Sequence, residues 1–122
     1  MKVAVTVWDE RISPVFDASR HLLIAEVEKN RIKSRSTVMF DPEMPSRLSK
    51  MLSDIGASVL ICGAVSQFPA SILAADGITL IPFITGRVDL VLAAFAAGKS
   101  LNPTFVMPGC GDRLRGMDEP VG

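Results

Sequence analysis

Residues 57–83 read ASVLICGAVSQFPASILAADGITLIPF, and no other part of the chain constrains the architecture as strongly. The run ASVLICG is continuously apolar, which is typical of a strand covered on both faces of a sheet. Ser66 can cap a short helix that stops at Gly77, and ITLIPF is a second buried strand. A strand, a helix and a strand in this order predict parallel strands joined by a right-handed crossover. The expectation is therefore an α/β protein.

Two further helices are predicted on either side of this unit. In residues 46–56 and 85–98 apolar side chains recur every three or four positions, as in a helix with one buried face. Pro45 suits the first turn of the earlier helix, and Gly56 suits the position just past its end. The apolar stripes consist of Leu48, Met51, Leu52 and Ile55 in the first helix and of Val88, Val91, Leu92 and Phe95 in the last.

The N-terminal part of the chain predicts further strands. MKVAVTVW (1–8) alternates in the manner of a strand, and residues 9–20 are rich in charge and turn formers, which predicts an exposed loop. Residues 21–40 predict a hairpin with its tight turn at Lys29-Asn30. In its second arm we expect one apolar face and one basic face at the sheet edge. The apolar face would hold Ile32, Val38 and Phe40, and the basic face Arg31, Lys33 and Arg35.

Together these segments predict one α/β domain, since 122 residues suffice for a single core. The sheet would be mixed and have about five strands, one of them antiparallel and contributed by the hairpin, with about three helices. The domain would comprise residues 1–100. Residues 101–122, which contain glycine, proline, cysteine and arginine, would form a flexible tail.

Charge and composition exclude several classes of function. Thirteen basic and thirteen acidic residues cancel, so no global field attracts nucleic acid or a membrane surface. The uncharged stretch 55–75 is interrupted by Gly63, Ser66, Gln67 and Pro69, and the apolar runs that remain are too short to cross a bilayer. The start of the chain reads as a strand and not as a signal peptide. With only two cysteines and no disulfide framework, we expect a cytoplasmic protein.

The candidate site lies where the parallel strands end, because ligands of open α/β sheets gather at the carboxyl ends of their strands. Three loops qualify, at residues 9–19, 62–66 and 83–86. The second and third lead into helix N-termini, where free backbone N–H groups favour an anion.

Cys62 has two interpretations. It ends an apolar strand, where a free cysteine commonly packs as a small hydrophobic side chain. Alternatively, the start of the following helix lowers the pKa of its thiol and favours the thiolate.

Cys110 stands between two glycines, which cannot pack around it, so it is either incidental to a disordered tail or a soft-metal ligand on a flexible arm. Arg113 could balance an anionic cluster beside it. Since two cysteines cannot complete a tetrahedral zinc site, other ligands would come from a second subunit, from the sole histidine, His21, or from a cluster with its own sulfides.

Two sets of carboxylates are candidates for binding metal ions. Asp9, Glu10 and Asp17 could hold a hard divalent cation, and Asp9, Asp17 and Asp41 would be the set for a metal-dependent phosphodiesterase or nuclease. With one histidine and no nucleophile-elbow sequence, a catalytic triad has no support. The absence of a catalytic set favours a binding protein over an enzyme.

Three segments carry a resemblance to a known family: MKVAVTVWDERISPVFDASRHLLIAEVE (1–28), LICGAVSQ (60–67) and GRVDLVLAAFAAGKS (86–100). In their order and spacing they resemble the dinitrogenase iron–molybdenum cofactor biosynthesis family. The tail FVMPGCGDRLRG (105–116) is similar to the tails of some members. The resemblance implies a ribonuclease-H-like fold and a role in binding or carrying iron–molybdenum cofactor, its precursors or other molybdenum–sulfur clusters.

The chain also departs from the family pattern. Where the family usually has Ser-Pro-His-Phe-Gly, residues 13–17 read Ser-Pro-Val-Phe-Asp, so Val15 replaces a histidine and Asp17 a glycine. The Cys-Gly-Gly turn becomes Cys62-Gly63-Ala64. Any ligand role of the missing histidine would pass to His21 or to a cysteine.

The resulting hypothesis is a non-enzymatic carrier or assembly protein for an anionic iron–sulfur or molybdenum–iron–sulfur cluster. Its partners would be the cluster and a cofactor-assembly or recipient protein, and a homodimer is compatible with the sequence. The alternatives are the metal-dependent hydrolase and a plain interaction module that uses Val65 and Phe68. The cluster would be bound by Ser13, Phe16, Asp17, Gly63, Ala64, Ser66, Gly86 and Arg113, with Cys62, Cys110 and His21 as metal ligands.

Overall fold

A single mixed sheet forms the centre of the protein, for which the computed structural model describes residues 1–102 and 104–108. Five strands follow one another across it in the order β4-β3-β1-β5-β6, and the two-residue strand β2 pairs with β1. β1 and β3 are antiparallel, whereas β1, β5 and β6 are parallel. The strands are β1 (Lys2–Trp8), β2 (Arg11–Ile12), β3 (His21–Glu28), β4 (Arg31–Met39), β5 (Ala57–Ile61) and β6 (Thr79–Ile81).

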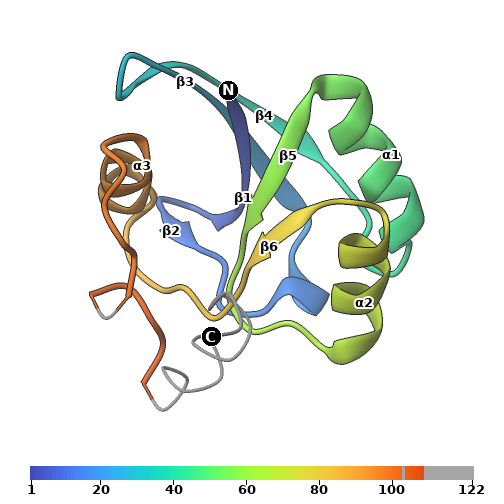
Figure 1. Ribbon diagram of the computed structural model, residues 1–122. Coiled ribbons are helices and arrows are strands. Elements are labelled where there is room, and N and C mark those ends of the chain that lie inside the picture. The colour runs from blue at the N-terminus through green and yellow to red at the C-terminus, as the bar shows by residue number, and fades with distance from the viewer. Residues whose placement is uncertain (103, 109–122) are drawn as a thin grey trace, which may run out of the picture.

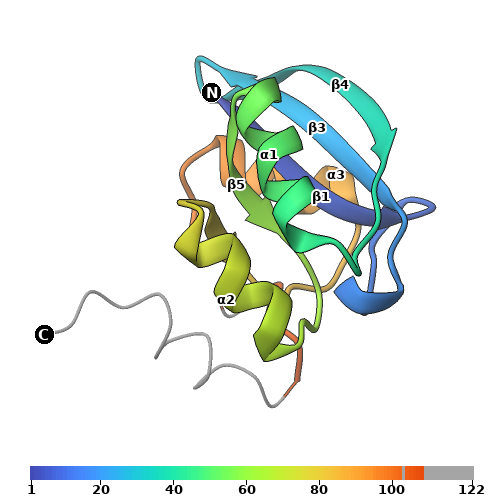
Figure 2. The same ribbon diagram turned by 90° about the vertical axis from the view of Figure 1, so that its right-hand side faces the viewer.

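Three helices cover the two faces of this sheet. Figure 1 shows α1 (Pro45–Ile55) and α2 (Gln67–Ala75) on one side and α3 (Val88–Ala96) on the other. Figure 2, turned by 90°, has α1 and α2 in front of the strands. The fold class expected from the sequence, a mixed α/β sheet of the ribonuclease-H-like kind in one domain, is confirmed.

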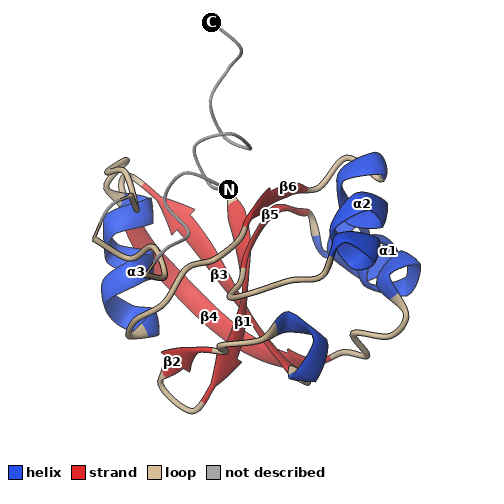
Figure 3. Ribbon diagram, turned by 90° about the horizontal axis from the view of Figure 1, so that it is seen from below, coloured by secondary structure: helices blue, strands red, loops and turns tan. Residues whose placement is uncertain are grey.

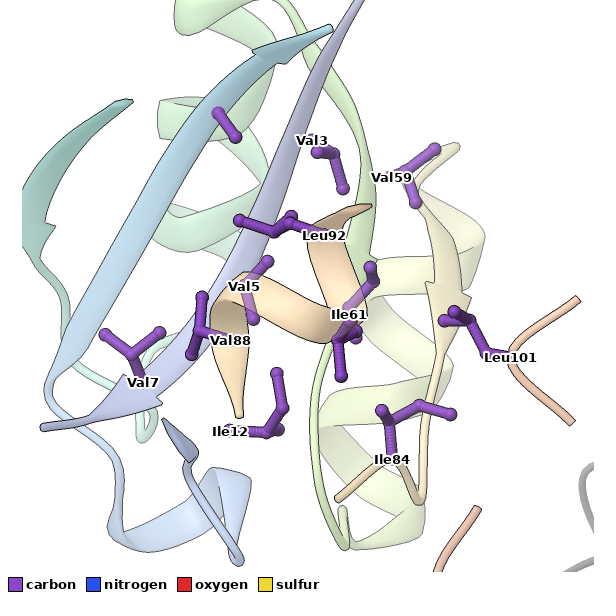
Figure 4. Packing of buried hydrophobic residues seen from close by; sticks show 12 residues of the cluster. Val3, Val5, Val7, Ile12, Val59, Ile61, Ile84, Val88, Leu92 and Leu101 are labelled. Atoms are coloured by element: carbon purple, nitrogen blue, oxygen red, sulfur yellow. The ribbon is translucent and has the colours of Figure 1, made fainter. Parts of the chain in front are cut away.

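β1 lies at the centre because both of its faces are apolar. Val3 and Val5 are fully buried in the core beneath α3, while Ala4 is fully buried in the core beneath α1 and α2. Figure 4 shows the first of these cores, in which Val88 and Leu92 of α3 pack against the valines of β1. Because successive side chains of a strand point to opposite faces, β1 contributes residues to both cores.

The helix ends follow the sequence signals. α1 begins at Pro45 and is followed by Gly56, whose φ of 92° is left-handed and whose N–H bonds to the Leu52 and Ser53 carbonyls. Ser66 occupies the N-cap position of α2, as predicted, but its side chain makes no capping bond to the helix. Its hydroxyl has another partner, described below.

Two expectations for the N-terminal half are wrong in detail. The segment predicted as an exposed loop, 9–20, contains β2 and a short 3-10 helix at Phe16–Ala18, because its backbone finds partners in distant loops. The second hairpin arm does not present a single apolar face: the register shifts between Glu26 and Val27. Ile32 consequently packs on the α3 side and Val38 on the α1 and α2 side.

The start of the predicted tail lies against the domain. Ile84 and Val106 form an antiparallel bridge, and Leu101 is 7% exposed. Residues 109–122 lie outside the described part of the chain, so the flexibility of the tail stays a prediction. Within residues 1–102 and 104–108, no helix combines the length and apolarity that a membrane crossing requires.

Candidate functional site: the rim at the carboxyl ends of β1, β5 and β6

Loops from three parts of the sequence meet where β1, β5 and β6 end. Figure 3 looks onto this end of the molecule, where β2 and the 3-10 helix lie next to the loops after β5 and β6. We call the loops 9–19, 62–66 and 82–87 the rim. Backbone hydrogen bonds join them: Ile12 N to Gly86 O at 2.9 Å, Phe16 N to Ala64 O at 2.7 Å and Phe83 N to Gly63 O at 2.9 Å.

The first two loops approach each other closely at Gly63. Ala64 N donates to Pro14 O at 2.9 Å, and Val15 and Ala64 form a parallel bridge. A Cβ on Gly63 would lie 2.7 Å from the carbonyl carbon of Pro14 and closer still to the carbonyl oxygens of Ser13 and Pro14. Only glycine permits this contact, because the obstacle is backbone.

Asp17 joins the loop after β1 to the start of α2. Its Oδ2 accepts a hydrogen bond from Ser66 N at 3.2 Å, and its Oδ1 accepts one from Ser66 Oγ at 2.9 Å. A carboxylate at this position satisfies an N-terminal amide and complements the positive end of the helix dipole. The chain itself therefore supplies an anion where the sequence predicted a free anion-binding amide.

The loop before α3 is also satisfied from within the chain. Thr85 N donates to Phe105 O at 2.7 Å and Val88 N donates to Glu10 O at 2.9 Å. The expectation of free N–H groups is wrong for these two residues, because backbone carbonyl oxygens of other loops accept their hydrogen bonds. Gly86 has a φ of 128° and lies against Phe105. Its neighbour is therefore Phe105, whereas Asp17 and Ser66, two other predicted site residues, contact each other.

Cys62 is enclosed. It is fully buried in the core formed with α1 and α2. Burial, together with the negative charge of Asp17, raises the pKa of its thiol. The interpretation of Cys62 as a helix-activated thiolate is wrong for this physical reason, and the interpretation as a packed side chain agrees with the structure. To act as a metal ligand, its thiol would have to become accessible.

The side chain of Phe16 is also part of the hydrophobic core. It is fully buried, and its ring centroid lies 5.6 Å from that of Phe40. Its backbone N–H, not its ring, reaches the second loop. Ser13 is 5% exposed, and its hydroxyl contacts the carbonyl oxygen of Val15 at 3.4 Å.

A groove at the edge of the rim brings together the end of β1, the loop 9–19 and the start of β3. It has a volume of about 440 Å³ and is lined by Val7, Trp8, Ser13, Pro14, Val15, Ala18, Ser19, Arg20 and His21. We call it the Trp8 groove. His21 reaches it because His21 pairs with Val7 at the end of β1. Trp8 and Arg20 were not among the predicted site residues, although a single tryptophan at a strand end beside a candidate loop is a usable signal.

Other predicted ligands do not converge. Among residues 1–102 and 104–108, no group of three or more His, Cys, Asp and Glu side chains is placed to hold a metal ion. Asp9, Asp17 and Asp41, the set for a metal-dependent hydrolase, therefore do not form a metal centre. Cys110 and Arg113 lie outside the described residues.

The fold and the rim define a small α/β protein of the ribonuclease-H-like class, with its loops gathered at one end of the sheet. The chain belongs to the dinitrogenase iron-molybdenum cofactor family, whose sequence pattern it matches over residues 1–98. No curated protein matches it.

Solved structures share the fold. The crystal structure of PH0822 is 25% identical, covers 81% of this chain and 93% of its own, and has a TM-score of 0.71. A candidate dinitrogenase (mj0327) from Methanocaldococcus jannaschii is 22% identical, covers 81% and 90%, and has a TM-score of 0.66. A candidate NifB protein from Thermotoga (TM1290), of the DUF35 family, is 21% identical, covers 80% and 89%, and has a TM-score of 0.61.

Proposed function

We propose that this protein is a carrier or assembly protein, and not an enzyme, for an anionic iron–sulfur or molybdenum–iron–sulfur cluster. The observation that carries the proposal is membership of the dinitrogenase iron-molybdenum cofactor family over residues 1–98. The proposed setting is cytoplasmic, where free thiols persist.

The rim is the proposed cluster seat. Its loops are tied to one another by backbone hydrogen bonds, so they form one surface. His21 borders this surface because it pairs with Val7 at the end of β1. Its imidazole would supply a nitrogen ligand to a metal.

Ligands from the C-terminal segment complete the proposal. Met107 N donates to Phe83 O at 2.8 Å, and Phe83 N donates to Gly63 O. The described chain thus ends beside the rim, and the Cys110 arm begins there. Because Cys62 is enclosed, Cys110 is the thiol that we expect to bind first, with Arg113 balancing the charge and His21 as a further ligand.

The test is anaerobic reconstitution with iron, molybdate and sulfide, followed by metal analysis and visible absorption. We expect a coloured, metal-containing protein, unchanged in Cys62→Ser and lost in Cys110→Ser. Arg115→Gln is the matched control for Arg113→Gln, which should weaken retention. A colourless, metal-free product that equals the Cys62→Ser/Cys110→Ser double variant would overturn the proposal.

Transfer of the cluster requires contact with a recipient protein or with a second copy of the chain. Phe68 on α2 is 70% exposed, unusually so for an aromatic side chain. We propose it as part of that contact. Sedimentation of the wild type and of Phe68→Ser tests the homodimer: a concentration-dependent dimer that Phe68→Ser abolishes supports it, and a monomer in both excludes it.

A further inference from the structure

We propose that the Trp8 groove binds a small organic carboxylate with a flat apolar body, a ligand separate from any metal cluster. This inference goes beyond the proposed function, because it concerns the metal-free protein and uses neither cysteine.

The size and walls of the groove suit an organic molecule. Its volume of about 440 Å³ falls within the range of about 300–1,000 Å³ that small-molecule sites occupy. Trp8 is 66% exposed and Val15 is 42% exposed on its walls, which Pro14 also lines. An indole face of this kind stacks on a flat apolar ligand. A bare inorganic ion would leave these apolar walls uncovered.

The positive charge of Arg20 in the groove favours a carboxylate at the polar end of the ligand. Arg20 donates one hydrogen bond, from Nη1 to Ser19 O at 3.0 Å, and none of the carboxylates among the described residues forms an ion pair with it. Asp17, three positions earlier in the chain, is engaged by Ser66. An unpaired planar guanidinium, on a wall without acidic side chains, matches a carboxylate in two-point geometry.

Ser19 gives a second, independent indication of a polar ligand atom. It lines the groove, is 3% exposed, and its hydroxyl has no hydrogen-bond partner among the described residues. A buried hydroxyl without a partner is unfavourable and uncommon.

The chain contains its own reporter for this site. Trp8 is the single tryptophan and there is no tyrosine, so fluorescence excited at the indole band arises at the groove wall. Metal-free protein is titrated with 3-phenylpropanoate, and calorimetry on the same samples detects binding that leaves the emission unchanged. The controls are 3-phenylpropan-1-ol, which lacks the charge, and propanoate, which lacks the ring.

We expect saturable binding of 3-phenylpropanoate, with each control at least about tenfold weaker, because each loses one of the two recognition elements. Arg20→Gln should lower the affinity for the carboxylate to that for the alcohol. Ala18→Phe, which fills the groove from an exposed position, should abolish binding of both. Arg31→Gln, at the far hairpin turn, should change neither, and circular dichroism of each variant verifies folding.

Absence of saturable binding, equal affinity for acid and alcohol, or full affinity in folded Arg20→Gln would each overturn the inference. None of these results bears on cluster binding, which is measured on reconstituted protein. Conversely, a metal-free result in reconstitution leaves the groove experiment intact.

Discussion

The carboxylate of Asp17 holds the first residue before α2, with Oδ1 2.9 Å from Ser66 Oγ and Oδ2 3.2 Å from Ser66 N. Forty-nine positions of sequence separate the two residues. Through this pair the loop after β1 contacts the start of α2. The negative charge of the Asp17 carboxylate also opposes ionisation of the Cys62 thiol and so contributes to its raised pKa.

Replacing Asp17 by alanine should destabilise the protein by about 0.5–1 kcal/mol, since an N-terminal helix amide and a hydroxyl lose their acceptor at an exposed site. Urea unfolding measures the change. The matched control is Asp76→Ala at the other end of α2, where a carboxylate opposes the dipole; it should cost nothing. In a double-mutant cycle with Ser66→Ala the two losses should be less than additive, and strict additivity would contradict the contact.

A second prediction concerns the close approach at Gly63. Gly63→Ala should cost more than about 2 kcal/mol, because the new methyl group meets the backbone of Ser13 and Pro14 and one loop must move. Gly77→Ala is the control: its φ of 86° is strained for alanine but nothing lies within 4 Å, so the expected loss is about 1 kcal/mol. Equal losses in urea unfolding would show that the contact is looser than the structure has it.

Much of the fold is predictable from the sequence, because local patterns match the final packing. The apolar run at 57–61 becomes β5, Ser66 precedes α2, and the glycines at 56 and 77 end helices with left-handed φ. The prediction fails where pairing is not local. β2 is only two residues long, and in addition to its pairing with β1 it has a hydrogen bond from Ile12 N to Gly86 O, far along the chain.

The site is less predictable, for the same reason. The strand pattern indicates the loops at 13–17 and 62–66, and the structure brings them into contact. That Asp17 occupies the start of α2 is not readable from the sequence, because it depends on contact between these loops. The burial of Cys62 agrees with one of its two interpretations, the packed side chain. The Trp8 groove needs the β1–β3 register, which brings His21 beside Val7.

The hairpin turn provides a third prediction. Lys29 and Asn30 have φ values of 53° and 63°, as in a type I′ turn, which favours Asn-Gly. Lys29→Asn/Asn30→Gly should therefore stabilise the protein by about 0.5–1 kcal/mol by relieving lysine in the left-handed region. Thermal and urea unfolding measure the gain. Asn30→Val, with a branched side chain at positive φ, should have the opposite sign, and a gain in that variant would refute the turn assignment.

The last prediction uses the raised thiol pKa of Cys62, in a Cys110→Ser background so that only one thiol remains. Below the ordinary thiol pKa of about 8.5 both folded and unfolded chains keep the proton, so this group adds no pH dependence. Above it the unfolded thiol ionises while the folded thiol stays protonated. The free energy of unfolding should therefore fall between about pH 8.5 and 10, by up to about 1.4 kcal/mol per pH unit.

Cys62→Ala in the same background has a packing defect but no thiol, so its curve of unfolding free energy against pH should lack this component. Parallel pH dependence in the two proteins, or rapid labelling of Cys62 by a thiol reagent without denaturant, would mean that the side chain is accessible and that the rim opens in solution.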